Sequence, residues 1–357
     1  MAKRSIVLLN LGGPDRPESV QPFLNNLFND PAIIGLPAIL RLPLAKFIST
    51  KRAPIAREIY GHLGGKSPLL PLTEEQAVAL CKALTTEDPA HIYKVFIAMR
   101  YWHPFSQETA SAVKAFDPDE ILLLPLYPQY STATSASSFI DWKKSAAKVG
   151  LVKPTYTLCC YPVNENWARA QSDLLLAQID TLENKQKYRV LFSAHGLPKK
   201  IVKRGDPYQW QVERSAEAIA KAADLTEEAW AVCYQSRVGP LEWIGPSLDD
   251  ELKRAAEDDV AVIVLPIAFV SEHSETLVEL DIEYRKISEE LGIVAYKRVP
   301  ALGTHPDFIC GLRDLSLIAF QKKINFGPPE NTRFCPQEAA KCKCVAPINL
   351  TRKTQYD

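Results

Sequence analysis

Eight short runs rich in Val, Ile and Leu, separated by longer polar segments of helical pattern, dominate this sequence. Strands that alternate with helical segments are typical of βαβ units around a parallel sheet. We therefore predict an α/β fold with two doubly wound parallel sheets. The predicted strands are 5–11, 93–99, 120–126 and 153–159 in the first half of the chain, and 188–193, 229–235, 261–268 and 294–299 in the second.

The two halves also resemble each other in the residues that come after each strand. "VLLNLGGP" at 7–14 matches "VLFSAHGLP" at 190–198, and "ILLLPLYPQYS" at 121–131 matches "VIVLPIAFVS" at 262–271. We therefore predict two similar Rossmann-like domains, each with a four-stranded parallel sheet flanked by helices. The predicted division is an N-terminal domain over 1–160, a C-terminal domain over 161–328 and a Cys-rich tail over 329–357.

Polar residues directly after the predicted strands are the candidates for a site, because open α/β sheets bind ligands beyond the carboxyl ends of their strands. The cleft between the two domains would gather them. His195 is prominent, since an imidazole exchanges protons near neutral pH, although a lone histidine is often structural. The candidates chosen by this rule are Arg100, Tyr101, Tyr130, Ser131, His195, Gln235, Ser236, Glu272 and His273.

An acidic row comes after the strand at 261–268. If a helix begins after Ser274, then Glu275, Glu279 and Glu283 fall at i, i+4 and i+8 on one face, where like charges repel by roughly 0.2–0.5 kcal/mol per pair. Such rows are usually solvated helix faces. This one starts where the cleft is expected, and carboxylates beside an imidazole suit a loosely held divalent metal or a proton relay.

The first half carries an insertion within 20–66, because its first two strands lie about 45 residues farther apart than their counterparts. Residues 23–48 are strongly apolar, and Pro31, Pro37 and Pro43 are expected to break them into short helical pieces. Two interpretations remain open. The segment is a helical hairpin packed on the core, or it is an apolar lip over the cleft that contacts a membrane and admits an apolar ligand.

Three thiols crowd the tail. Cys335, Cys342 and Cys344 have C-x6-C-x-C spacing and suggest a soft metal site that takes a fourth ligand from Cys159 or Cys160. Adjacent strand residues point to opposite faces, so we expect only one of that pair to serve. A tail with free thiols and a zinc site are the alternatives. The remaining cysteines, Cys81, Cys233 and Cys310, read as core thiols.

Composition excludes some partners. Lys plus Arg equals Asp plus Glu at 42 each, so no general positive charge attracts nucleic acid. No run approaches the roughly 18 apolar residues of a membrane span, and the apolar run at the N-terminus is too short for a signal peptide. We therefore expect a cytoplasmic protein whose cysteines stay reduced or bind metal.

The motifs together resemble those of the ferrochelatases, which insert ferrous iron into a porphyrin to make haem. The resemblance runs from about residue 5 to residue 300, and the Cys-rich tail is similar to that of the bacterial subset with a [2Fe-2S] cluster. The motifs that carry it are "LLNLGGP", "GGKSP", "MRYWHP", "LYPQYS", "LFSAHGLP", "YQSRVGPLEWIGP" and "AFVSEHSETLVELDIEY".

The resemblance implies a role for each matching residue. Fe²⁺ and protoporphyrin IX would be the substrates, and protohaem and two protons the products. His195 and Glu275 would be catalytic, on opposite sides of the macrocycle. The lip at 23–48 would contact the inner face of the cell membrane peripherally, and a homodimer is left open. The implied metal path is Glu272, His273, Glu279, Arg100 and Tyr101; the implied porphyrin contacts are Leu11, Arg52, Tyr60, Ser67, Tyr130, Ser131 and Trp243; the implied cluster ligands are Cys335, Cys342 and Cys344 with Cys159 or Cys160.

Two departures limit this comparison. Glu272 stands where the family usually has Asp, and Thr132 stands where animal-type enzymes have a cluster cysteine. The alternatives within enzymes are a coproporphyrin ferrochelatase and a cobalt chelatase of corrin synthesis. A non-catalytic porphyrin or metal carrier is the alternative of another class, and repeated turnover would distinguish an enzyme from it.

Overall fold

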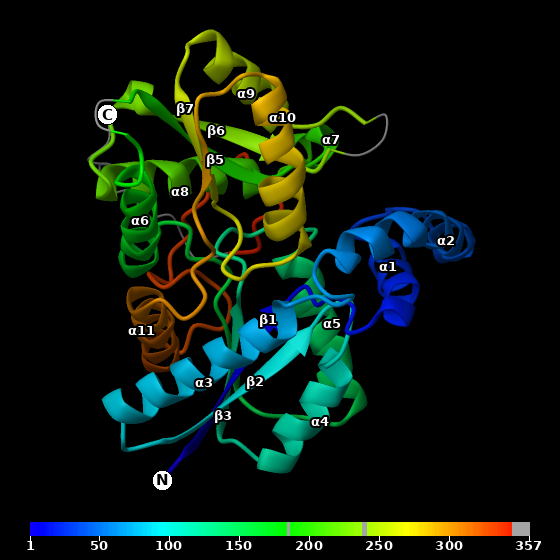
Figure 1. Cartoon of the computed structure of the whole chain (residues 1–357). Helices are drawn as coiled ribbons and strands as arrows, with labels where there is room; N and C mark the ends of the chain where they lie inside the picture. Colours follow the sequence, from blue (N-terminus) through cyan, green and yellow to red (C-terminus); the bar gives the residue numbers. More distant parts are fainter. Residues whose placement is uncertain (184–185, 238–240, 345–357) are drawn as a thin grey trace.

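Two four-stranded parallel sheets form the framework of the protein, as the computed structural model shows for residues 1–183, 186–237 and 241–344 (Figure 1). The strand order is β2-β1-β3-β4 in the first sheet and β6-β5-β7-β8 in the second, so the two sheets have the same topology. The predicted α/β class and all eight strands are confirmed. The strands are β1 (Lys3–Asn10), β2 (Ile92–Met99), β3 (Glu120–Pro125), β4 (Thr155–Thr157), β5 (Tyr188–His195), β6 (Trp230–Gln235), β7 (Ala261–Pro266) and β8 (Tyr296–Arg298).

Helices cover both faces of each sheet, because alternate side chains of a strand point to opposite faces. In β1, Ile6 and Leu8 belong to one core and Val7 and Leu9 to another. The helices that pack on the first sheet are α3 (Leu69–Glu87), α4 (Ser106–Phe116) and α5 (Ser135–Lys148). Those of the second are α6 (Glu165–Ile179), α8 (Tyr208–Ala222) and α9 (Leu248–Glu257), with α7 (Lys199–Lys203) and the turn η2 (Glu227–Ala229) in the connections.

The last helix, α11 (Pro306–Lys322), connects the two halves. It packs against α6 of the second half and also against α3 and β3 of the first. Leu8 and Leu80 of the first half share one core with Phe192 of the second and Phe308 of α11. The two sheets are therefore joined by a common core.

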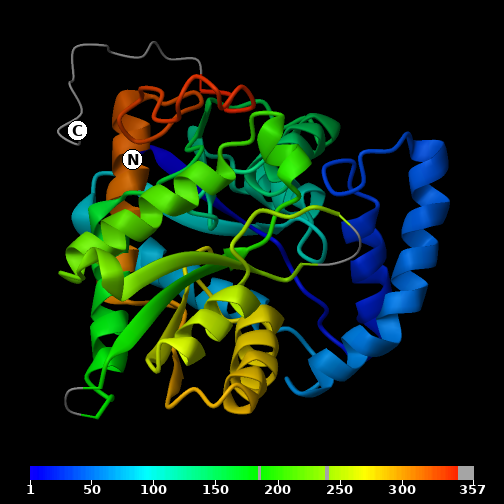
Figure 2. The ribbon, with the colours of Figure 1, turned by 90° about the horizontal axis from the view of Figure 1, so that it is seen from above.

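The insertion in the first half forms a helical pair beside the two sheets (Figures 1 and 2). After the turn η1 (Pro17–Ser19), α1 (Val20–Phe28) packs against α2 (Ala38–Gly61). The expectation that Pro43 breaks this segment is wrong, since Pro43 and Pro54 both lie inside α2. A proline removes only one backbone hydrogen bond, and the packing of α2 on α1 offsets that loss. Pro31 and Pro37 do fall between the two helices.

The acidic row begins an unusual helix. Residues Glu275–Tyr284 form a π-helix, η3, which continues into α10 (Arg285–Glu290). In the part of the chain that the structure describes, no helix is long and apolar enough to cross a membrane.

Candidate active site

A cavity of about 540 Å³ opens at the carboxyl ends of the strands of both sheets, as the sequence predicts. Leu11 follows β1, Leu126 follows β3, and His195 ends β5, and all three line the cavity. The lip provides a further wall. Its residues in the lining are Leu27, Phe28, Ala32, Ile33, Ile34 and Ile48, and Arg52, one turn further along α2, lines the cavity as well.

His195 presents one ring nitrogen to this cavity as a proton acceptor. Its Nδ1 lies 2.6 Å from the carbonyl oxygen of Gly196, which can only accept a hydrogen bond, so Nδ1 carries the proton in the neutral ring. Nε2 then has a free lone pair and lies 4.0 Å from Oε1 of Glu275. Gly196 permits this turn, because a Cβ there would lie 2.9 Å from the carbonyl oxygen of Gln235.

Glu275 sits between two imidazoles at the start of the π-helix. Its Oε2 lies 3.8 Å from Nε2 of the buried His273, which also lines the cavity. Burial by itself would raise the pKa of Glu275, but the positive charges that His195 and His273 can carry lower it to about 2. The two imidazoles therefore favour the carboxylate form of Glu275. Both ring nitrogens of His273 and Oε2 of Glu275 are buried, and no hydrogen-bond partner for them occurs among the described residues.

The short distance between His195 and Glu275 constrains where a flat ligand can lie. A ring between two side chains needs on the order of 7 Å between them, since each contact takes up about 3.5 Å. The observed 4.0 Å is less than that. The expected placement of a macrocycle between the two residues thus requires one side chain to turn away as the ring enters.

Glu279 continues the acidic row toward the surface. Its Oε1 accepts a hydrogen bond from the backbone N–H of Ser236 at 3.0 Å, and its Oε2 accepts one from the Ser236 hydroxyl at 2.5 Å. Burial, followed by the charge of Glu275, raises the pKa of Glu279 to about 7. Glu283, four residues further on, is exposed. The row thus runs from a carboxylate held between two imidazoles, through one whose pKa is raised to about 7, to solvent.

Glu272 is placed differently from its neighbours on the implied metal path. It does not line the cavity, and its Oε1 accepts a hydrogen bond from Arg298 at 2.7 Å. Arg100 also lies outside the lining, whereas Tyr101 contributes to it. Both of these residues bind Asp30, in the turn between α1 and α2: Arg100 Nη2 at 2.9 Å and the Tyr101 hydroxyl at 2.8 Å from Oδ2.

The implied porphyrin contacts fall into two groups. Leu11, Arg52, Ser131 and Trp243 line the cavity. Tyr60, Ser67 and Tyr130 are buried outside the lining. Burial raises the pKa of Tyr60 to about 12, and its hydroxyl is hydrogen-bonded to Ser274, next to Glu275.

Two aspartates that no motif singled out organise the walls of the cavity. Asp30 holds the lip, and Asp206 accepts hydrogen bonds from the hydroxyl of Ser131 at 3.1 Å and the backbone of Thr132 at 2.7 Å. Each aspartate also accepts a hydrogen bond from the N–H two residues later, at 2.8 and 2.9 Å. Both precede a proline, and Asp-Pro is a turn signal that could have marked them in the sequence.

The tail thiols and the pair at 159–160 come together beside Tyr130. The sulfurs of Cys159 and Cys160 are 3.3 Å apart, so both point the same way, contrary to the expectation for strand neighbours; the chain has already left β4 there. Gln211 donates hydrogen bonds to the sulfurs of Cys335 at 3.0 Å and Cys160 at 3.4 Å. A hydrogen bond from Cys335 lowers the pKa of Cys342 to about 6, although burial opposes it.

Cys159 lies beside Cys160, and Cys335 is hydrogen-bonded to Cys342. Among the described residues, no three or more His, Cys, Asp or Glu side chains form a group that could hold a metal ion. The eight cysteines, all of which lie in the described part of the chain, form no disulfide.

The sequence matches one family of known proteins over most of its length. A model of the ferrochelatase family matches residues 3–318. Ferrochelatase from Pelagibacter ubique is 48% identical over 345 residues, covering 96% of this chain and 99% of the relative. Ferrochelatase from Caulobacter vibrioides is 54% identical over 310 residues, covering 87% of this chain and 88% of the relative. Ferrochelatase from Phenylobacterium zucineum is 50% identical over 345 residues, covering 96% of this chain and 98% of the relative.

A solved structure shares the fold. SirB from Bacillus subtilis with Fe³⁺ superimposes with a TM-score of 0.51 at 11% identity, and the match covers 91% of this chain and 99% of that one. The superposition supports a common fold, and at this identity the likeness extends to the fold alone.

Proposed function

The chain belongs to the ferrochelatase family and inserts iron into a porphyrin in haem synthesis; within that function, we propose that its porphyrin is protoporphyrin IX and that His195 is the base. The observation that carries the choice of porphyrin is the charge of the cavity. Arg52 is the one Lys or Arg side chain among the described residues that line it, and most of the others are apolar.

Protoporphyrin fits such a lining better than its four-propionate relative. Protoporphyrin has two propionates and carries vinyl and methyl groups on the rest of its rim. Coproporphyrin would place two further carboxylates against an apolar wall, and burying a carboxylate without a partner costs several kcal/mol. The lip side chains Phe28, Ile33 and Ile48 are suited to the vinyl edge.

The test is anaerobic mixing of the purified protein with Fe²⁺ and either porphyrin, followed by the loss of porphyrin fluorescence. We expect repeated turnover, with kcat/KM for protoporphyrin at least about tenfold higher, a difference of about 1.4 kcal/mol. Equal or faster reaction with coproporphyrin would contradict the choice of substrate. Stoichiometric binding of both porphyrins without turnover would indicate a carrier.

The geometry supports a division of roles. Insertion releases two pyrrole protons, and Nε2 of His195 is the free acceptor that faces the cavity. The carboxylate of Glu275 stabilises the imidazolium that results. His273, Glu275 and Glu279 supply nitrogen and oxygen donors for the incoming Fe²⁺, and the row through Glu279 to Glu283 gives protons a route to solvent.

The thiols support a [2Fe-2S] cluster as part of the same proposal. Each iron of such a cluster takes two thiolates, and the thiols that gather around Gln211 and Cys335 could supply them. Cys335, Cys342 and Cys344 would be ligands, with Cys159 or Cys160 as the fourth. When bound, a cluster of this type can accept or release one electron.

We expect the anaerobically purified protein to contain about two irons and two sulfides per chain, the content of one such cluster. Cys342→Ala should remove them, whereas Cys81→Ala, which changes a thiol in α3, should not. Iron and sulfide analysis with electron paramagnetic resonance of the reduced protein would measure this. Separate Cys159→Ala and Cys160→Ala variants would identify the fourth ligand, and zinc without sulfide would contradict the assignment.

The outer face of the lip supports peripheral contact with the cytoplasmic side of the membrane. Ile39 and Phe47 of α2 are 81% and 61% exposed, which is unusual for apolar side chains on one helix. We expect the protein to float with vesicles of anionic lipid and the double variant Ile39→Glu, Phe47→Glu to stay behind. Val78→Glu is the matched control, because Val78 of α3 is 72% exposed and lies outside the lip; this variant should float like the parent protein. Equal flotation of all variants would contradict the contact.

A further inference from the structure

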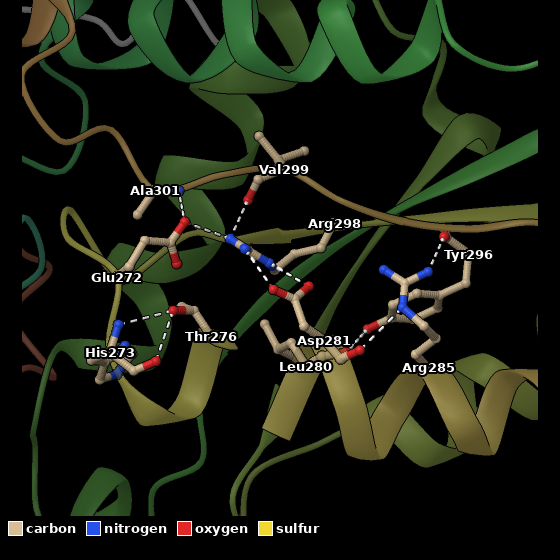
Figure 3. A network of polar contacts seen from close by, with 10 residues as sticks. All are labelled: Glu272, His273, Thr276, Leu280, Asp281, Arg285, Tyr296, Arg298, Val299 and Ala301. Carbon is tan, nitrogen blue, oxygen red and sulfur yellow. Dashed lines mark hydrogen bonds and ion pairs between the residues drawn. The ribbon is translucent and has the colours of Figure 1, made fainter. Parts of the chain in front are cut away.

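Arg298, the last residue of β8, binds the carboxylates of Glu272 and Asp281, which stand directly before and after residues 273–280 in the chain (Figure 3). Its Nε and Nη2 donate to the two oxygens of Asp281 at 2.8 and 2.7 Å. Its Nη1 donates to Oε1 of Glu272 at 2.7 Å, and the N–H of Ala301 donates to the same oxygen at 2.9 Å. A two-point contact of guanidinium with carboxylate is among the strongest and most directional ion pairs in proteins.

The two carboxylates bound by Arg298 lie close in the chain to residues of the site. Glu272 is in the loop after β7, directly before His273, and Asp281 is within the π-helix, two residues after Glu279. Between them in the chain lie His273 and Glu275, which line the cavity, and Glu279, the next carboxylate of the acidic row. Arg298 therefore fixes residues 273–280 at both ends.

The π-helix is a rare conformation that occurs frequently at functional sites. Here further contacts from outside the helix hold it in place. The same strand makes a second contact to the same turn, because the Tyr296 hydroxyl donates to the carbonyl oxygen of Leu280 at 2.9 Å. Arg285 adds a third, donating to the carbonyl oxygens of Asp281 and Tyr296 (Figure 3).

We propose that Arg298 is a positioning residue for metal delivery: its contacts with Glu272 and Asp281 set the positions of His273, Glu275 and Glu279, and with them the affinity for the incoming Fe²⁺. Glu272 acts in this as an anchor. This inference rests on the iron-insertion function. Of the implied porphyrin contacts, Arg52 is on α2 and Ser131 follows β3, and neither touches Arg298, so we expect the effect of Arg298 to fall on the metal more than on the porphyrin.

The test compares Arg298→Met with Arg189→Met. Arg189 is a fair control because its side chain is 11% exposed against 10% for Arg298, and it forms an ion pair of 2.7 Å with Asp258 at the opposite end of the sheet. The measurements are KM for Fe²⁺ and kcat in the anaerobic assay, the porphyrin dissociation constant by fluorescence, and the urea midpoint of each variant.

We expect Arg298→Met to raise KM for Fe²⁺ about 10- to 100-fold, the usual effect of losing a residue that orients metal ligands. The porphyrin dissociation constant should stay within about twofold of the parent value. The KM of Arg298→Lys for Fe²⁺ should fall between those of the parent protein and Arg298→Met, because an ammonium keeps the charge but cannot make the two-point contact. Asp281→Asn should raise KM for Fe²⁺ by itself and add little to Arg298→Met.

Other outcomes overturn the inference. If KM for Fe²⁺ is the same in the Arg298→Met and Arg189→Met variants, Arg298 has no special role. If KM and the porphyrin constant rise together, the effect is general loosening of the fold. Should Arg298→Met fail to fold, Arg298→Lys and Asp281→Asn decide in the same way. A parent protein that does not insert iron would contradict the proposed function itself, a result distinct from unchanged kinetics in an active enzyme.

Discussion

Replacing His195 by alanine is expected to lower the rate of iron insertion by about 100- to 10,000-fold, the usual contribution of a general base. The reason is the tautomer: Nδ1 is committed to the carbonyl of Gly196, so the acceptor that faces the cavity is Nε2. The porphyrin dissociation constant should change little, because Arg52, Trp243 and the apolar wall remain. Single-turnover fluorescence with excess Fe²⁺ would measure both quantities.

Glu275→Gln tests the partner of that base. The amide keeps the shape of the side chain and removes the charge, so the imidazolium loses its counter-ion and Fe²⁺ loses a donor; insertion should again fall by at least about 100-fold. His103→Ala is the matched control, since His103 follows β2, is 53% exposed and pairs with Glu108 at the surface. Near-normal turnover in either active-site variant would show that the roles are misassigned.

Asp30→Ala is expected to cost about 3–5 kcal/mol of stability, as the loss of one member of a buried ion pair generally does. The carboxylate is almost completely buried and accepts hydrogen bonds from Arg100, Tyr101 and Ser137. Without it, those donors lose their acceptor, and the turn that holds the lip is released. Porphyrin affinity should therefore fall as well, because the lip lines the cavity.

The control for the Asp30 variant is a substitution of Asp141, a second carboxylate beside the Arg100 guanidinium. Asp141 lies 3.7 Å from Arg100 and is 30% exposed, so Asp141→Asn should cost no more than about 1 kcal/mol. Urea unfolding followed by tryptophan fluorescence would compare the two variants. Equal stabilities would mean that Asp30 does not anchor the lip.

The sequence predicts the framework well because the strands have a strong local pattern. A fully apolar run such as "AVIVLP" is compatible with few structures other than a strand buried on both faces, and the crevice rule then selects His195 and His273, which line the cavity. The rule also selects Gln235 and Ser236, which bind Glu279.

The features that the sequence does not predict depend on contacts between distant residues. A spacing of four residues between Glu275 and Glu279 is compatible with an α-helix and with the π-helix that forms, and the contact of Arg298 with that helix comes from a separate strand. Glu272 looks like a metal ligand beside His273, but its partner lies 26 residues later on β8. Pro43 reads as a break, yet tertiary packing keeps α2 continuous.

The common core has a thermodynamic consequence. Because α11 packs with both sheets, neither half has a complete core without it, and the chain should unfold in one cooperative transition instead of two. A porphyrin bound where the two sheets meet would then raise the melting temperature of the entire molecule, since it binds only the folded state.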